Sequence, residues 1–334
     1  MKKMVMLFAG IMLLLALSAC GQKSQGDVVS DLNEKIGEMK GYKANAKMTL
    51  KMGTEPQVYT VEIWHKNPAF YRVNLKNEEK DQSQMILKND DGVYVLTPAL
   101  NKSFKFQSEW PENSSQAYLY ESLVKDITED KSATYKETDK HYVFETKTRY
   151  QNNKMLPFQE ITLNKKDLSP VSVKVMDPDK TALVLVEFSK VKFDTTFDKD
   201  AFDMKKNMTS AQLEAPVMAE VKDEGFSVKY PSNLDDMNLT EEKKIAADGG
   251  DRVILTYEGS TSFTLVQEKA KVVQTSVSTN VNGEPVDLGF TVGAMTGNTV
   301  AWTFDGVDYM LASKDLTQEK MIEIARSVGG DSVK

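Results

Sequence analysis

The feature that most restricts the fold of this sequence is an unbroken alternation of apolar and polar residues from position 42 to position 52. The apolar residues fall on every second position, and they are Tyr42, Ala44, Ala46, Met48, Leu50 and Met52. Successive side chains of a β-strand point to opposite faces, so this run predicts a long strand with one dry face. Further short strands are predicted at 59–64, 70–75, 85–88, 93–96, 103–106, 142–146, 158–163, 171–176 and 182–188. So many short strands favour a mostly antiparallel sheet.

Two helices are predicted beside this sheet, at 27–40 and 115–127, because apolar residues recur there at helical spacing. Residues 209–221 break the pattern and predict a linker. Beyond it, residues 222–334 predict a smaller β-rich domain that ends in a helix capped by Thr317. Within that domain, Asp305-Gly306 predicts a two-residue hairpin turn. The sequence therefore predicts an α+β protein of two domains, and its 334 residues are enough for two hydrophobic cores.

The first twenty residues have the features of an export signal. Lys2 and Lys3 precede an uncharged apolar stretch, 4–17, which is shorter than the roughly 20 residues of a membrane-spanning helix. This stretch ends in Leu17-Ser18-Ala19-Cys20, a branched residue followed by two small residues and a cysteine, which is the pattern of a lipoprotein signal. We therefore predict a signal peptide at 1–19, lipid attachment at Cys20 and a polar tether at 20–26. Two or three acyl chains hold a protein stably on a membrane where one does not.

Composition and charge exclude several classes of function. Cys20 is the only cysteine, so the chain cannot form an internal disulfide or a cysteine-based metal site. The formal net charge is −7 and becomes more negative without the signal peptide, which argues against nucleic acid as a partner. His65 and His141 lie in strand patterns without a nucleophile motif, and no glycine-rich phosphate loop is present. We expect neither a metal nor a cofactor, and no enzymatic activity.

Several stretches, taken in order, resemble the lipoprotein carriers of the LolA/LolB-like fold. They are the run Trp64-His65-Lys66-Asn67-Pro68 with Phe70 and Arg72, the hairpin at 91–98, the stretch 163–170 and the aromatic ending at 188–202. The resemblance covers about residues 27–205. It implies an unclosed antiparallel β-barrel over 27–208, with helices as a lid over an apolar cavity that accepts acyl chains. Soluble carriers have an arginine before the proline, where it latches the lid, whereas this chain has Asn67.

An anchored chain with an added C-terminal domain most resembles the YdcC-like sporulation lipoproteins of endospore-forming bacteria. The stretch from Tyr309 through Thr317 to Val328 is similar to a β-plus-helix module found in several such envelope proteins. This resemblance implies a position on the outer face of the cytoplasmic membrane.

These observations leave two hypotheses for the function. In the first, the chain is a membrane-anchored, non-enzymatic lipoprotein that binds a lipid or acyl chain and contributes to sporulation and envelope assembly. Met48, Leu50 and Trp64 are then candidate lining residues of its cavity, although their spacing fits a packed core equally well. In the second, the chain is an interaction scaffold that docks an envelope or cell-wall enzyme. In both hypotheses the Cys20 lipid binds the membrane.

Overall fold

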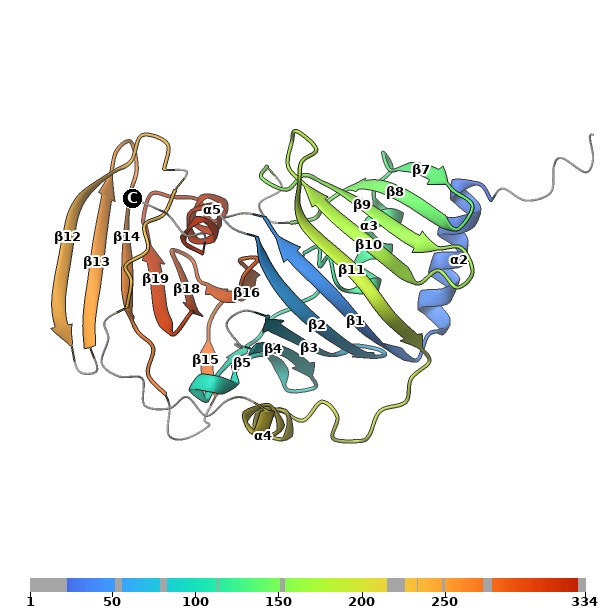
Figure 1. The fold of residues 1–334 in the computed structure, drawn as a ribbon, viewed down its shortest axis with the longest axis horizontal. Coiled ribbons are helices and arrows are strands. Elements are labelled where there is room, and N and C mark those ends of the chain that lie inside the picture. The colour runs from blue at the N-terminus through green and yellow to red at the C-terminus, as the bar shows by residue number, and fades with distance from the viewer. Residues whose placement is uncertain are drawn as a thin grey trace, which may run out of the picture.

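The structure is a computed structural model, and it describes residues 23–51, 56–78, 83–112, 114–150, 154–214, 226–232, 234–247, 250–272 and 278–329. Cys20, the predicted signal peptide and the first residues of the predicted tether lie outside these ranges. The described residues form two β-sheets with helices packed against them, and the N-terminal helix lies at the far end of the molecule from the second sheet (Figure 1).

Eleven strands from the N-terminal part of the chain form one antiparallel array in the described structure. They are β1 (Gly41–Leu50), β2 (Gln57–Lys66), β3 (Phe70–Asn77), β4 (Ser83–Asn89), β5 (Gly92–Thr97), β6 (Lys102–Phe106), β7 (Thr134–Glu137), β8 (His141–Lys147), β9 (Phe158–Asn164), β10 (Pro170–Met176) and β11 (Ala182–Phe193). Their order is β6-β5-β4-β3-β2-β1-β11-β10-β9-β8-β7, so β6 and β7 lie at opposite ends and do not pair with each other. The predicted unclosed antiparallel barrel is confirmed.

A twelfth strand of this sheet comes from the second domain. β15 (Thr279–Val281) pairs in parallel with β6, so that Thr279 lies opposite Phe104 and Val281 lies opposite Phe106. The β6 edge of the first sheet is therefore covered by β15, a strand that lies far from β6 in the sequence.

Two helices cover the inner face of the first sheet, which we define as the face that carries Tyr42 and Met48. They are α2 (Gln25–Glu38) and α3 (Tyr120–Glu129), and α3 begins later than the predicted position 115. Both helices bury apolar side chains in one cluster with that face. No helix in the described part of the chain is long and apolar enough to cross a membrane.

Helix α2 begins earlier than predicted, because Ser24 caps it. The Asp27 amide donates a hydrogen bond to Ser24 Oγ at 3.2 Å, and the Ser24 amide donates to the Asp27 carboxylate at 3.0 Å. This reciprocal pair satisfies backbone donors that a helix N-terminus leaves free. The prediction that the tether extends through residue 26 is therefore wrong, since the helix already starts at Gln25.

The outer face of the first sheet carries a second, smaller core. Met85 and Tyr94 pack there against Met208 of α4 (Met204–Glu214). The segment predicted as a linker, 209–221, is thus helical up to Glu214, and its remainder lies outside the described residues. The 3₁₀ helix η1 (Pro98–Leu100) connects β5 to β6.

The second domain contains a seven-stranded antiparallel sheet and a final helix, as predicted. The strands are β12 (Asn238–Ala247), β13 (Gly250–Glu258), β14 (Ser262–Lys269), β16 (Glu284–Asp287), β17 (Val292–Met295), β18 (Thr299–Phe304) and β19 (Val307–Ala312), in the order β12-β13-β14-β19-β18-β17-β16. Asp305 and Gly306 join β18 to β19 with φ angles of 52° and 72°, and two positive φ values are typical of a tight hairpin turn. Helix α5 (Gln318–Val328) begins where Thr317 accepts a hydrogen bond from the Lys320 amide at 3.3 Å.

Candidate functional site

The part of the inner face around Met48 and Leu50, where the resemblance implied a cavity for acyl chains, is filled by the protein's own side chains. Met48 and Leu50 are 5% and 4% exposed, and they line a void of about 10 Å³ together with Tyr118, Tyr150 and Arg326. A single water needs at least about 10–15 Å³ of such volume. The void at these two residues therefore has no room for an acyl chain, and their contact with a ligand stays a prediction.

Trp64 lies on the outer face, opposite the side that carries Met48. In the strand register it sits between Lys43 of β1 and Arg72 of β3. The Lys43 ammonium lies 3.8 Å from the indole ring centroid, and the Arg72 guanidinium carbon lies 4.3 Å from it. Such placements of a cation over a ring are stabilising. The prediction that Trp64 lines the same cavity as Met48 and Leu50 is wrong.

His65 fastens helix α3 to the sheet. Its side chain is 3% exposed, with Nε2 3.0 Å from Glu121 Oε1 and Nδ1 3.2 Å from the Phe70 carbonyl oxygen. Tyr42 donates to the other Glu121 oxygen at 3.2 Å and accepts from the Tyr120 amide at 3.1 Å. Glu121 was not singled out from the sequence, because only the fold brings it to His65.

Asn67, which stands where soluble carriers have an arginine, holds the end of the other lid helix. Its side-chain amide donates to the Met39 carbonyl at 3.0 Å, directly after α2. His141 lies at the start of β8, and its backbone amide donates to Thr138 Oγ1 at 3.0 Å. Among the described residues, no group of three or more possible metal ligands comes together.

A buried carboxylate ties α3 to strands β8 and β9. Asp126 accepts hydrogen bonds from Arg149 Nε at 2.5 Å, Ser115 Oγ at 2.9 Å and Gln159 Nε2 at 2.6 Å. Burial raises the pKa of Asp126, while the charge of Arg149 and the three donors oppose that rise. Ser115 precedes α3, Arg149 follows β8 and Gln159 lies on β9, so the arrangement indicates a fixed helix rather than a catalytic acid.

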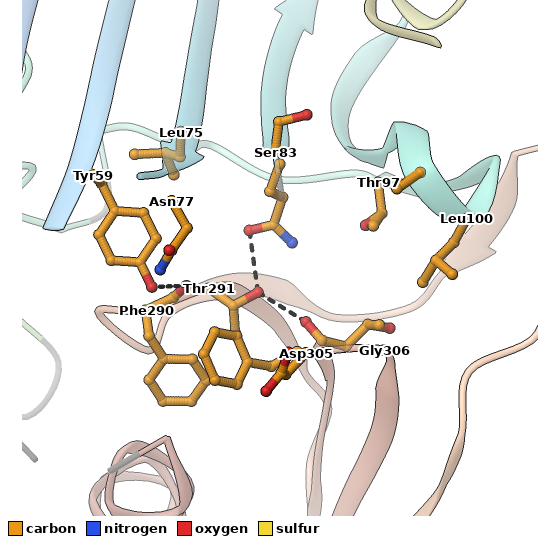
Figure 2. A pocket seen from close by; sticks show the side chains of 14 residues that line it. Tyr59, Leu75, Asn77, Ser83, Thr97, Leu100, Phe290, Thr291, Asp305 and Gly306 are labelled. Atoms are coloured by element: carbon orange, nitrogen blue, oxygen red, sulfur yellow. Dashed lines mark hydrogen bonds between the residues drawn. The ribbon is translucent and has the colours of Figure 1, made fainter. Parts of the chain in front are cut away.

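Open space remains farther along the inner face, where Tyr59 and Leu75 meet the second domain. Figure 2 shows the side chains that line a pocket there. The pocket has a volume of about 50 Å³. Tyr59, Leu75 and Thr97 come to it from the first sheet, and Phe290 and Thr291 come from the second domain. Tyr59 donates to the Phe290 carbonyl at 3.1 Å, and burial raises the pKa of Tyr59 to about 12, so its hydroxyl remains a donor at neutral pH.

One side chain of this pocket, Gln84, forms hydrogen bonds with both backbone polar groups of a single residue in the second domain. Gln84 Oε1 accepts from the Val292 amide at 2.7 Å, and Gln84 Nε2 donates to the Val292 carbonyl at 3.2 Å. The Thr291 hydroxyl, drawn in Figure 2, also donates to Gln84 Oε1 at 3.2 Å. Gln84 thereby satisfies both backbone polar groups of Val292, the first residue of β17.

A larger pocket of about 150 Å³ adjoins the first one. The two share Gln84, Thr97 and Thr303 in their walls. Sequence reasoning did not find either pocket, because their walls come from strands of different domains. The only signal in the sequence was the cluster of aromatic residues in both parts, which fits a core equally well.

The chain is similar to a protein family, to a named protein and to several solved structures. A family model described as sporulation protein YdcC-like matches residues 1–202. "Sporulation protein YdcC" of Bacillus subtilis (strain 168) is 56% identical over 334 residues, which are 100% of this chain and 98% of that protein. Among solved structures, the MucA/MucB complex of Pseudomonas aeruginosa matches with 14% identity over 91% of this chain and 99% of that chain, at a TM-score of 0.33. A putative outer membrane lipoprotein-sorting protein domain from Vibrio parahaemolyticus matches with 14% identity over 54% of this chain and 96% of that chain, also at a TM-score of 0.33.

Proposed function

The chain belongs to the family of YdcC-like sporulation proteins, and on that premise we propose that it is a membrane-anchored, non-enzymatic protein of the cell envelope that acts in sporulation. The name of the 56% identical relative supports the role in sporulation. The positions of the histidines support the absence of catalysis, because His65 is engaged by Glu121 and by a backbone carbonyl.

The anchor in this proposal is the lipid on Cys20, which would hold the protein on the outer face of the cytoplasmic membrane. Helix α2 starts at Gln25, so only a few residues separate the anchor from the folded part. Each buried CH₂ group of the lipid contributes about 0.8 kcal/mol to membrane binding. Because only a few residues separate Cys20 from α2, the folded part would stay close to the bilayer surface.

Of the two hypotheses for what the protein does there, we favour the interaction scaffold. The observation that carries this choice is the packing of the inner face around Met48 and Leu50, where the void measures about 10 Å³. An acyl chain could enter at Met48 and Leu50 only if α2, α3 or the second domain moved away. Glu121 and Asp126 hold α3 in place through bonds to the sheet, which makes such an opening costly. A body with fixed helices suits the docking of a partner protein.

The experiment measures, in one purified sample of the chain, how much partner protein and how much lipid it has bound. The lipidated chain is crosslinked in sporulating cells and purified, the protein partners are quantified, and native mass spectrometry searches for bound lipid. We expect one envelope protein in a fixed ratio to the chain and no lipid beyond the Cys20 anchor. Additional lipid bound to the folded part, without a protein in fixed ratio, would select the carrier hypothesis instead.

A matched pair of variants sharpens this test. Glu121→Gln weakens the fastening of α3, because a neutral amide replaces the carboxylate that faces His65. Glu129→Gln changes the same kind of side chain at the exposed end of the same helix. If the protein were a carrier, loosening the lid should increase the captured lipid in the first variant only. A scaffold should capture no lipid in either variant.

A further inference from the structure

The two sheets end in edge strands of very different length in the described structure. Three of the edge strands, β15, β7 and β16, have only three or four residues each, and short edge strands give another chain little to pair with. The fourth, β12, has ten residues. It lies at the left end of the molecule in Figure 1, away from α2, and no described segment pairs with its outer edge. β12 is therefore the one long open edge among the described strands.

The side chains of β12 are exposed on both of its faces. All of them from Asn238 to Ala246 are exposed, and they include the large apolar residues Leu239 and Ile245, at 41% and 38%. Fixing the backbone of a strand costs conformational entropy, which burial normally offsets. At such an edge the N–H and C=O groups of alternate residues point away from β13, so a further strand can pair with them. A strand added there would offset part of the entropy cost.

The middle of β12 carries two acidic residues followed by two basic residues, Glu241-Glu242-Lys243-Lys244. None of them forms an ion pair with a described residue, and Glu242 accepts one hydrogen bond, from the Tyr230 hydroxyl at 2.9 Å. Because successive side chains alternate, Glu241 and Lys243 share one face of the strand, and Glu242 and Lys244 share the other. Lysines on an edge strand usually oppose pairing with another strand. Here two glutamates precede them, so a second β12 running in the opposite direction presents the opposite charges.

Two copies of β12 can form a closed, symmetric pair only as antiparallel strands around a twofold axis perpendicular to the sheet. Opposite residues then share a face, so the residue at the axis lies opposite its own copy. With Glu242 at the axis, Glu241 of each copy lies opposite Lys243 of the other. With Lys243 at the axis, Glu242 of each copy lies opposite Lys244 of the other. Either register gives two opposite-charge pairs against one like-charge pair at the axis, so attractive contacts outnumber the repulsive one.

We propose that β12 pairs antiparallel with β12 of a second copy of this chain, across a twofold axis at Glu242 or Lys243. The pairing joins the two seven-stranded sheets into one continuous sheet. It uses neither the inner face of the first sheet nor the space between the domains. It goes beyond the scaffold role and does not depend on it.

The first test places one cysteine at a time on positions 240–246 of the full chain, as the cell produces it, and adds copper–phenanthroline to oxidise adjacent thiols to a disulfide. Cys20 is the only cysteine of the unmodified chain, so that chain gives the background. Opposite residues of antiparallel strands have Cα atoms about 4.5–5.5 Å apart, a distance that a disulfide bridges. One position away from the axis, the two copies of a residue lie about 8 Å apart, which is too far for a disulfide.

We expect the disulfide-linked dimer to peak at Glu242→Cys or at Lys243→Cys, with at least tenfold less product at the positions on either side of the peak. Lys190→Cys, at an exposed position of β11, should give only the background. A flat profile along β12 or a peak at any other position would overturn the proposal. So would a disulfide with another protein in place of a second copy.

The second test exchanges the charges of β12. Lys243→Glu with Lys244→Glu makes the block wholly acidic, and Glu241→Lys with Glu242→Lys makes it wholly basic. Each variant alone should dimerise about tenfold more weakly, because every cross-strand charge pair becomes a like-charge pair. An equimolar mixture should form a mixed dimer, since all of these pairs are then of opposite charge. Native mass spectrometry of the lipidated full chain, released from detergent micelles, detects the mixed dimer by its own mass when one variant is labelled with ¹⁵N.

The matched control is Lys190→Glu with Lys192→Glu, which changes the net charge by the same amount at exposed lysines of β11. It should dimerise like the unmodified chain. Unchanged dimerisation of both charge variants would overturn the proposal. A mixture that stays monomeric, although both variants keep the unfolding midpoint of the unmodified chain, would overturn it as well. If either charge variant fails to fold, the cysteine scan still decides the question.

Discussion

Replacing Gln84 by Met should loosen the docking of the two domains. Met has nearly the length of Gln but no donor and only a weakly accepting sulfur, so the Val292 carbonyl loses its partner and the Val292 amide loses its strong one. An unpaired buried polar group costs about 1–3 kcal/mol. Gln84 is only partly buried, so water can replace part of the lost bonding. We therefore expect a total loss of about 1–3 kcal/mol from the docked state.

This loss has a direct readout in amide hydrogen exchange. If exchange at Val292 requires the domains to separate locally, a loss of 1–3 kcal/mol raises the exchange rate about 5- to 150-fold. The control is Gln212→Met on α4, where the side chain donates to Asn101 Oδ1 at 2.7 Å outside the domain interface. That variant should leave the Val292 rate within about twofold. Equal rates at Val292 in the Gln84→Met variant and the unmodified chain would refute the role assigned to Gln84.

The remaining predictions concern the lid, the last helix and the anchor. Asp126→Ala should lower the free energy of unfolding by about 3 kcal/mol in urea, because Arg149 and the other donors lose a buried acceptor; a loss under 1 kcal/mol would contradict this. Because burial raises the folded-state pKa of Asp126, its contribution to stability is fully present below the unfolded-state value of about 3.9 and is lost as the pH rises through the folded-state value. The stability difference between the unmodified chain and Asp126→Asn should therefore fall as the pH rises above about 4, and a difference that stays flat would speak against the raised pKa. Thr317→Ala should cost about 1 kcal/mol of stability in thermal unfolding, whereas Thr317→Ser should keep most of it. Cys20→Ala should abolish palmitate labelling and membrane retention, and a variant that stays as firmly attached would disprove the anchor.

The elements that local patterns determine were predicted well from the sequence. The cap at Thr317 and the turn at Asp305-Gly306 depend on residues that are neighbours in the chain, and both are in place. The long strand over 42–52 was recognised as well, because its alternation of apolar and polar residues is regular; β1 ends at Leu50. The start of α2 was missed by two residues, because the cap at Ser24 was not recognised.

What depends on contacts between distant segments could not be predicted. The face on which Trp64 lies could not be predicted, because the first sheet has an apolar core on each side and an apolar residue fits either one. The filling of the inner face depends on Tyr118 and Arg326, which lie far from Met48 in the sequence. The hydrogen bonds between Gln84 and Val292 could not be predicted from the sequence pattern, since a partly exposed glutamine in a strand is common.

The contribution of β15 to the first sheet has a consequence for the order in which the chain matures. An exported chain passes through the membrane from its N-terminus, and its first segments reach the outside long before Thr279 does. Until then β6 has an unprotected edge, with backbone groups that another chain can pair with. In the proposed export, the N-terminal domain would keep an unpaired β6 edge until residues 279–281 have emerged, and truncation before residue 279 should leave that edge unpaired permanently.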